Sequence, residues 1–402
     1  MVIDSTGVLN RPCAGKPAPP SRAKRLKVLH VGKFYPPHRG GIENHLEALC
    51  KQLHRDVDVE VLVSNRSRTT EEEVLDGIPV TRLATAGTLA RTSINPGLIA
   101  GIRQSNADII HIHWPNPAAT LAHLLSRHPA RLVITYHSDV VRQRLLGALF
   151  SPFLEASLKR SDAIIAASPD YVESSPHLRN HKDRCQVIPY GIPDDCFRPR
   201  NESAVAALRQ KFGEPLVFSV GRLVYYKGFD QLIRAMQWAP GRLLIAGDGP
   251  LRGELVLLAE KLGLADRVEF VGNPSNEELH QLYHAADVFV LASVARSEAF
   301  GIVQAEAMAT GKPVVNTRLA SGVPFVSQHG RTGLTVPPSD PEALGQAIRL
   351  LLEDHSLRTN FGRAARHRAE TVFRASTMTA DTLSLYEEVM AGVRSTQRTR
   401  SR

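Results

Sequence analysis

The sequence predicts an α/β protein made of two doubly wound domains. Its length of 402 residues is enough for two domains of ordinary size, since domains average roughly 150 residues. Hydrophobic residues make up 43% and charged residues 22%, as is typical of a soluble globular protein. Short apolar strands alternate with helical patterns in each half. This alternation indicates parallel sheets covered by helices on both faces.

The first half contains five apolar segments that we expect to be strands, at 27–34, 59–65, 109–114, 131–137 and 163–168. A Pro- and Gly-rich loop at 35–41 follows the first of them. The next residues place Ile42, Leu46, Leu49 and Leu53 at intervals of three or four, which predicts an amphipathic helix. We therefore expect a domain over 26–192.

The same alternation restarts in the second half, with expected strands at 216–221, 242–247, 268–272, 288–293 and 313–316. The segment 188–200, IPYGIPDDCFRPR, is rich in Pro and charge, which is typical of a linker. The second domain is predicted over 198–372. In such sheets ligands bind beyond the carboxyl ends of the strands, so we expect a site where both domains face a shared cleft.

The formal net charge of +9 raises nucleic acid or an anionic membrane as partners. Residues 1–25 contribute +4 and residues 394–402 another +4, which leaves +1 for 26–393. Because a nucleic-acid-binding domain needs a basic body, the prediction is no nucleic acid. Residues 1–25 are predicted to be a disordered leader and 394–402 a basic tail.

Cysteine use and hydropathy bear on the compartment. The four cysteines are scattered without a CxxC pair, which favours a reducing, cytoplasmic setting and makes a zinc site improbable. No run of 18 apolar residues occurs, and residues 1–25 lack the apolar core of a signal peptide. The expected localisation is therefore cytoplasmic.

Two candidate site segments lie in the first domain. Gly40 and Gly41 end a loop and open a helix, where backbone amides can approach a phosphate; a plain tight turn explains them equally well. His137, Ser138 and Asp139 directly follow a predicted strand, where polar side chains contact ligands. A loop cap with an incidental histidine is the alternative.

Two further segments lie in the second domain. Arg222 and Lys227, framed by glycines at a strand-to-helix turn, suit a diphosphate, although isolated loop cations are usually only solvated. In SEAFGIVQAEAM (297–308), Glu298 precedes a helix that contains Glu306 among apolar residues. Backbone amides at 300–302 would face an anion, and carboxylates suit vicinal hydroxyls; a helix cap with one half-exposed glutamate is the alternative.

Other patterns carry less weight. A DxD at 56–58, a form that holds metal in some enzymes, sits on the wrong edge of the predicted sheet. His111 and His113 alternate on a buried strand, where a core role is several times more probable than metal binding. The dinucleotide fingerprint GxGxxG is absent, which disfavours a nicotinamide enzyme.

These motifs together resemble the family 4 retaining glycosyltransferases. The resemblance rests on Gly40-Gly41-Ile42-Glu43, His137-Ser138-Asp139, Arg222 with Lys227, Glu298 with Glu306, and the IPYGIP hinge, in this order. It implies the GT-B fold, in which two Rossmann-like domains face a central cleft. It also implies that a helix at 373–393 packs back toward the first domain. Residues 136–146 and 168–179 resemble the branch that builds bacterial O-antigens and exopolysaccharides.

The resemblance implies a role for each matching residue. The catalytic set would be His137 beside the anomeric carbon, Arg222 and Lys227 at the departing diphosphate, and Glu298 at the sugar. The resemblance implies donor contacts from Gly41, Val271, Gly272, Phe300, Gly301, Ile302 and Glu306, the last of these to the ribose hydroxyls. It places Gly40, Glu43 and Asp139 on the acceptor side. Position 299 is Ala where the family commonly has Gly.

The implied reaction moves a hexose, with mannosyl transfer as the nearest type, from a GDP- or UDP-sugar to a glycan or polyprenyl-linked acceptor. Configuration is retained, and no metal or other cofactor is needed. The segment 140–160 mixes basic and apolar side chains, which suits peripheral binding to the inner face of a membrane; a packed helix with a solvated basic edge is at least as probable. Other open interpretations are an epimerase-like GT-B enzyme and a basic-tailed membrane- or nucleic-acid-binding protein.

Overall fold

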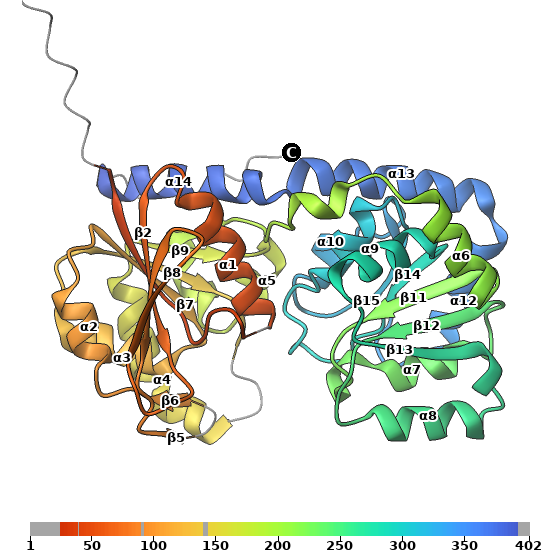
Figure 1. The fold of residues 1–402 in the computed structure, drawn as a ribbon, viewed down its shortest axis with the longest axis horizontal. Helices are drawn as coiled ribbons and strands as arrows, with labels where there is room; N and C mark the ends of the chain where they lie inside the picture. The colour runs from red at the N-terminus through yellow and green to blue at the C-terminus, as the bar shows by residue number, and fades with distance from the viewer. Residues whose placement is uncertain (1–24, 39, 90–91, 140–143, 393–402) are drawn as a thin grey trace, which may run out of the picture.

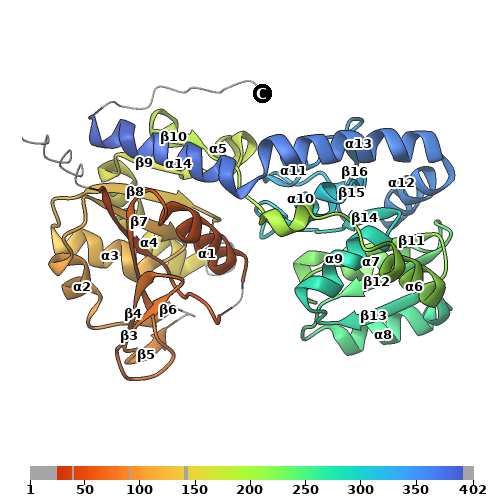
Figure 2. The ribbon, with the colours of Figure 1, turned by 45° about the horizontal axis from the view of Figure 1, so that its top comes forward.

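The computed structural model describes residues 25–38, 40–89, 92–139 and 144–392. They form two α/β domains side by side, and two long C-terminal helices run along one edge of both (Figure 1 and Figure 2). The predicted α/β class with two doubly wound domains is confirmed. The predicted leader and basic tail lie outside the described residues, except for Arg25. Its guanidinium donates to the backbone oxygens of His54 and Val57.

The first domain is built on an eight-stranded sheet. Its spatial order is β10 (Cys185–Val187), β9 (Ala163–Ala166), β8 (Arg131–Tyr136), β7 (Ile109–Trp114), β1 (Lys27–Val31), β2 (Asp58–Ser64), β4 (Ile78–Leu83) and β3 (Glu71–Leu75). Only β3 runs antiparallel to its neighbour. Sequence reasoning missed β3, because its EEEVL segment is an exposed acidic edge without an apolar pattern. A small hairpin, β5 (Gly87–Leu89) and β6 (Thr92–Ile94), stands apart.

Helices cover both faces of this sheet because its strands are apolar on both faces. One face packs against α2 (Leu98–Gln104), α3 (Pro117–Ser126), α4 (Arg144–Arg160) and α5 (Pro169–Ser174). The other face packs against α1 (Gly41–Leu53) and α14 (Ala375–Met390). In α1, Leu46, Leu49 and Leu53 are buried, as the spacing predicted. In α4, Leu154 is buried and Phe153 is exposed.

The second domain is built on a six-stranded, fully parallel sheet. Its order is β13 (Val268–Gly272), β12 (Arg242–Ala246), β11 (Leu216–Val220), β14 (Val288–Leu291), β15 (Val314–Thr317) and β16 (Gly333–Val336). One face packs against α6 (Glu202–Phe212), α9 (Asn276–Ala285), α10 (Val303–Ala309), α11 (Val323–Val326) and α13 (His355–Val372). The other packs against α7 (Phe229–Ala235), α8 (Arg252–Lys261) and α12 (Pro341–Glu353).

The chain crosses between the domains twice, and the two crossings are hydrogen-bonded to each other. Ile192 donates its amide to the oxygen of Phe373 at 2.7 Å, and Ala375 donates its amide back to Ile192 at 3.1 Å. A side chain at Gly191 would stand 2.5 Å from the Cα of Ala375, so this close approach requires glycine. After the second crossing, α14 lies on the first domain, where Tyr386 is fully buried (Figure 1).

Across the described ranges, we find no helix that is both long and apolar enough to cross a membrane.

Candidate active site

Three loops of the second domain meet at the carboxyl ends of β11, β12 and β13. The amide of Gly221, just after β11, donates to the oxygen of Ala246 at 3.0 Å, and that of Leu223 donates to Asp248 at 2.9 Å. The amide of Gly247 donates to the oxygen of Gly272 at 2.5 Å. Glycines are needed here because a Cβ at Gly247 would stand 2.1 Å from the oxygen of Gly221. Sequence analysis expected a ligand site at this edge.

Lys227 and Glu298 form a partly buried ion pair beside these loops. Nζ of Lys227 lies 2.6 Å from Oε2 of Glu298, with side-chain exposures of 12% and 10%. Ser293 donates its hydroxyl to the same oxygen at 3.0 Å. Burial is the largest single influence and lowers the pKa of Lys227. The charges of Glu298, Tyr226 and Glu306 and the hydrogen bond to Glu298 together outweigh it, so the pKa is raised. The ammonium is therefore held charged at one position.

Arg222 stands on the same turn as an exposed cation. Its side chain forms no hydrogen bond or ion pair with the described residues. Burial raises the pKa of Tyr226, and the charge of Arg222 is close enough to oppose that rise. Gly228, directly after Lys227, has a φ of +66°, and a Cβ there would stand 2.1 Å from the oxygen of Ala292. The turn thus offers one fixed and one free positive charge.

Glu306 projects from α10 toward the same cluster. Its Oε2 accepts the hydroxyl hydrogen of Tyr283 at 2.6 Å. Burial raises the pKa of Glu306, and this is opposed by the hydrogen bond from Tyr283 and the charge of Lys227. The carboxylate keeps acceptor capacity for a further polar group, because Tyr283 occupies only part of it.

The segment before α10 presents backbone donors. The amides of Phe300, Gly301 and Ile302 donate to no acceptor within the described parts of the chain. Gly301 has a φ of +71°, where a Cβ would stand 2.5 Å from Leu291. Free amides in this conformation suit phosphate or hydroxyl oxygens.

His137 is buried where the first domain meets the second. Its Nδ1 lies 2.7 Å from the hydroxyl of Tyr190 and its Nε2 lies 3.1 Å from Nδ1 of His113. The ring of Tyr190 lies 4.8 Å from that of Phe300 in the second domain. Burial lowers the pKa of His137 well below its usual value, so the ring is neutral at neutral pH. Both of its ring nitrogens are engaged by protein groups.

Asp139 makes a contact between the domains. Its carboxylate accepts hydrogen bonds from Tyr136 at 2.9 Å and Ser175 at 2.8 Å. Its second oxygen pairs with Arg296 at 3.1 Å, and Arg296 also donates to the oxygen of Ser174 at 3.0 Å. The carboxylate of Asp139 is thus already occupied by three protein hydrogens, one of them from Arg296, and this pair holds Arg296 against the first domain.

The start of α1 lies near His137. His45 on this helix has its ring centroid 5.0 Å from that of His137 and 4.5 Å from that of Tyr190. Gly41 is exposed, and a Cβ there would meet nothing within 4 Å. At Gly40, by contrast, a Cβ would collide with the carboxylate of Glu43.

Of the predicted site residues, Lys227 and Glu298 are joined by a direct contact, and the charge of Glu306 is close enough to raise the pKa of Lys227. Lys227, Glu298 and Glu306 form one charged cluster, while Val271 and Gly272 end β13 at the same sheet edge. Sequence reasoning missed four residues that hold the predicted ones in place: Tyr190, Tyr283, Ser293 and Arg296. Tyr190 stands in the IPYGIP segment, which was interpreted only as a hinge. Tyr283 and Arg296 gave no spacing signal, because their partners are 23 and 157 positions away. Ser293 lies near Glu298 in the sequence, but both follow β14 in irregular chain, where no helix or strand period pairs them.

Family comparisons agree with this arrangement. Residues 39–195 match the profile described as Glycosyltransferase Family 4, and residues 202–368 match Glycosyl transferases group 1. The D-rhamnosyltransferase WbpZ of Pseudomonas aeruginosa is 34% identical over 354 residues, covering 87% of this chain and 93% of its own length. The chain belongs to the family 4 glycosyltransferases. The expected family and the GT-B fold are confirmed.

Other relatives of this glycosyltransferase cover nearly its whole length. The O-antigen chain mannosyltransferase C of Escherichia coli is 31% identical over 369 residues, 91% of this chain and 99% of its own. Among solved structures, a sucrose-phosphate synthase from Thermosynechococcus elongatus matches with a TM-score of 0.76 and 25% identity over 92% of this chain. Anabaena Alr3699/HepE in complex with UDP matches with a TM-score of 0.74 at 22% identity, a likeness of fold alone.

Proposed function

We propose that this glycosyltransferase moves a hexose of mannose type from a nucleoside-diphosphate sugar to a glycan or lipid-linked acceptor during cell-surface polysaccharide synthesis. The observation that carries the proposal is the cluster of Lys227, Glu298 and Glu306 beside exposed Arg222 and the free amides of 300–302. Two cations and backbone donors match a diphosphate, and a carboxylate matches ribose hydroxyls.

The proposed donor is GDP-linked. The relatives named for mannosyl and D-rhamnosyl transfer support a sugar of mannose configuration. A third relative, from Mycolicibacterium smegmatis, is named as a GDP-mannose-dependent mannosyltransferase and is 30% identical over 361 residues. UDP-sugars are the alternative donors that the experiment below compares.

In the proposed mechanism the protein stabilises the departing diphosphate. Lys227 and Arg222 neutralise the charge that develops on the leaving phosphate, and the amides of 300–302 donate to its oxygens. The pair with Glu298 holds the Lys227 ammonium in position before the donor arrives. The acceptor hydroxyl approaches from the face that the diphosphate leaves and gives its proton to a phosphate oxygen, so configuration is retained.

We propose that this chemistry needs no metal ion or other cofactor. Divalent cations in phosphoryl- and glycosyl-transfer sites neutralise the leaving group, and here Lys227 and Arg222 supply that charge. Activity that is unchanged by a chelator and unstimulated by Mg²⁺ or Mn²⁺ is the expected result. A requirement for either ion would contradict this part of the proposal.

The acceptor is proposed to be carried on the cytoplasmic face of the membrane, where the enzyme binds peripherally. Support comes from exposed Phe153 on α4, and from the basic residues of 140–160 and of the two terminal segments. Co-sedimentation with vesicles containing anionic lipid tests this part, and deletion of residues 394–402 should weaken the binding.

The main experiment is transfer of labelled sugar from a panel of GDP- and UDP-sugars to acceptor glycans. Lys227→Ala and Glu306→Ala are compared with the wild type. Lys261→Ala and Glu260→Ala are matched controls, because both residues are exposed on α8 of the same domain. We expect the two site variants to lose about a hundredfold or more in kcat/KM, as when one electrostatic donor is removed from an active site.

The controls should stay within twofold of the wild type. Full activity in both site variants would contradict the proposed donor site. Turnover of the donor without any mass transferred to an acceptor would indicate other sugar-nucleotide chemistry, such as epimerisation.

A further inference from the structure

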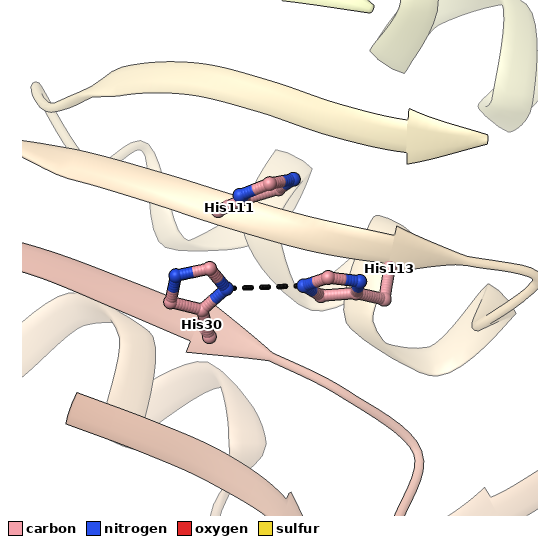
Figure 3. A group of neighbouring side chains, drawn as sticks. All are labelled: His30, His111 and His113. Atoms are coloured by element: carbon pink, nitrogen blue, oxygen red, sulfur yellow. Dashed lines mark hydrogen bonds between the residues drawn. The ribbon is translucent and has the colours of Figure 1, made fainter. Parts of the chain in front are cut away.

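A line of buried histidines leads from the domain interface into the first sheet. It starts at the hydroxyl of Tyr190, 2.7 Å from Nδ1 of His137. Nε2 of His137 lies 3.1 Å from Nδ1 of His113. Nε2 of His113 in turn lies 3.0 Å from Nδ1 of His30, the contact that Figure 3 marks with a dashed line. The three histidines come from the neighbouring strands β1 and β7 and from the residue after β8.

The line continues to the C-terminal helix and back to the sheet. The hydroxyl of Tyr386 on α14 lies 3.5 Å from Nε2 of His30, the longest and weakest contact of the series. The same hydroxyl lies 2.6 Å from Nδ1 of His111, whose Nε2 lies 2.6 Å from the hydroxyl of Thr135. We call these seven residues, Tyr190, His137, His113, His30, Tyr386, His111 and Thr135, the histidine array.

The imidazoles of the array meet edge to edge, as hydrogen-bonded rings do. His113 and His137 have ring planes 19° apart and centroids 5.3 Å apart, while their facing nitrogens are only 3.1 Å apart. The nitrogens therefore point at each other between the rings. A metal ion bonded to both in line would need a gap of about 4 Å, twice a zinc–nitrogen bond. This pair is thus set for a hydrogen bond.

Each imidazole in the array is neutral and carries one hydrogen. Burial lowers the pKa of His30 to about 3 and holds those of His111, His113 and His137 well below the usual value. A neutral imidazole donates from one nitrogen and accepts at the other. Each ring therefore passes the direction of hydrogen bonding on to the next.

The hydrogens of the array outnumber its contacts by one. Seven groups carry one hydrogen each, and six contacts join them. The spare hydrogen is costly at Thr135 or Tyr386, which are 1% and 0% exposed, because a buried donor without an acceptor loses its hydration. It costs least at Tyr190, which is 8% exposed and lies against Phe300 of the other domain.

This direction decides which group can contact a ligand. With the spare hydrogen at Tyr190, every hydrogen bond of the array points from Thr135 toward Tyr190. His137 therefore donates from Nδ1 to Tyr190 and accepts at Nε2 from His113. No nitrogen of His137 remains for a substrate. We propose that the hydroxyl of Tyr190, and not the ring of His137, donates the hydrogen bond to a hydroxyl or phosphate oxygen of the nucleotide sugar. The histidine array is then a positioning device that keeps this hydrogen directed out of the sheet.

This proposal depends on the proposed function only for the identity of the ligand. Its first test does not require a measurement of enzyme activity. Protein labelled with [15N]histidine is examined by two-dimensional NMR of the imidazole nitrogens, and the His137 signals are assigned by their loss in His137→Gln. We expect His137, His113, His30 and His111 all to carry hydrogen on Nδ1. Hydrogen on Nε2 of His137 overturns the proposal whatever the transferase assay shows.

The second test separates Tyr190 from a merely structural hydroxyl. Tyr190→Phe should lower kcat/KM about fivefold, the value of one neutral hydrogen bond. The matched control is Tyr35→Phe, since the hydroxyl of Tyr35 is equally buried and has no hydrogen-bond partner among the described residues. The control should stay within twofold of the wild type, with unchanged histidine signals.

A third variant tests the far end of the array. Tyr386→Phe removes only the hydroxyl that accepts from His111 and donates to His30. We expect a second set of tautomer signals at His30 and His137 and a fall in kcat with an unchanged KM for the donor. If Tyr190→Phe is as active as the wild type, or if the tautomers of the four histidines vary independently in Tyr386→Phe, the proposal is wrong.

Discussion

The Lys227–Glu298 pair shows how single residues set the charge of the candidate donor site. Removing a buried ammonium from water disfavours its charged form. The Glu298 carboxylate at 2.6 Å is the largest of the influences that together reverse this, and the charges of Tyr226 and Glu306 add to it. Glu298 thus acts on the site through Lys227 as well as by any contact of its own. Tyr283 similarly acts through Glu306, because its hydrogen bond favours the charged carboxylate.

One prediction belongs to this pair. In Glu298→Gln, the largest influence that opposes burial is lost, so the pKa of Lys227 falls. A lysine with a raised pKa stays charged to higher pH, and the variant should therefore lose affinity for GDP at a lower pH than the wild type. Calorimetric titration with GDP across pH 7–10 measures this shift, with Glu260→Gln as the exposed control. Parallel affinity curves for Glu298→Gln and the wild type would contradict the prediction.

At the scale of elements, the fold requires glycine at one strand-to-helix turn but not at another. Gly228 ends the short helical turn Tyr225–Lys227 with a φ of +66°, and a Cβ there would collide with the oxygen of Ala292. The fold therefore requires glycine at position 228. Gly41 opens α1 with open space around it, so the fold alone does not require glycine there.

The contrast predicts opposite outcomes for the same substitution. Gly228→Ala should lower the free energy of unfolding by about 2 kcal/mol or more, from the left-handed conformation and the collision. Gly41→Ala should leave it unchanged or raise it by up to about 1 kcal/mol, since alanine favours helix. Urea denaturation measures both.

Donor binding then separates function from structure at Gly41. If the diphosphate approaches the backbone of Gly41, Gly41→Ala should weaken GDP-sugar binding about tenfold in a fully stable protein. Unchanged affinity would leave Gly41 as a plain turn residue.

At the scale of the whole molecule, the core of the first domain contains titratable groups that must stay neutral. His30, His45, His111, His113 and His137 are all buried within the sheet or against it. Burial lowers the pKa of His45 to about 4 and that of His30 to about 3. Both ring nitrogens of His45 lack a hydrogen-bond partner among the described residues.

These histidines predict that stability falls with acid. The unfolded chain takes up protons below about pH 6.5, while the folded protein does not until its own lower pKa values are reached. Each histidine therefore costs about 1.4 kcal/mol per pH unit below 6.5, until its own lowered folded pKa is reached, and the five together cost up to about 7 kcal/mol per unit. Urea midpoints between pH 7.5 and 5 measure the slope.

His45→Leu supplies the internal check. It removes one neutral imidazole without breaking a hydrogen bond, so the slope should become shallower by about 1.4 kcal/mol per pH unit. A variant with the wild-type slope would show that His45 does not titrate with folding. His355→Leu, exposed at the start of α13, should leave the slope unchanged.

Much of the fold was predictable from local patterns. Continuous apolar segments located β7 and β13 to the residue, and the spacing of Leu46, Leu49 and Leu53 located α1. Such patterns work because burial on both faces of a parallel sheet demands apolar residues. The strands that were missed include β3, β5, β6, β10 and β16, because an exposed edge or a strand of three or four residues leaves too little pattern to recognise. The six-residue β4 was missed as well, although its Ile78, Val80 and Leu83 are buried.

The residues of the candidate site also fall into two groups, those that the sequence indicated and those that it did not. Residues at strand ends and in glycine-framed turns, such as Lys227 and Glu298, were recognisable because charged side chains at the carboxyl edge of a parallel sheet are a local signal of a candidate ligand site. The residues that hold buried histidines in place were not recognisable. Tyr386, for example, is hydrogen-bonded to His111 although the two are 275 positions apart in the sequence. By itself, the sequence determined the class of fold, the family and the candidate donor site. Only the tertiary structure decided which hydrogen bonds the histidines make, because those depend on groups that folding alone brings together.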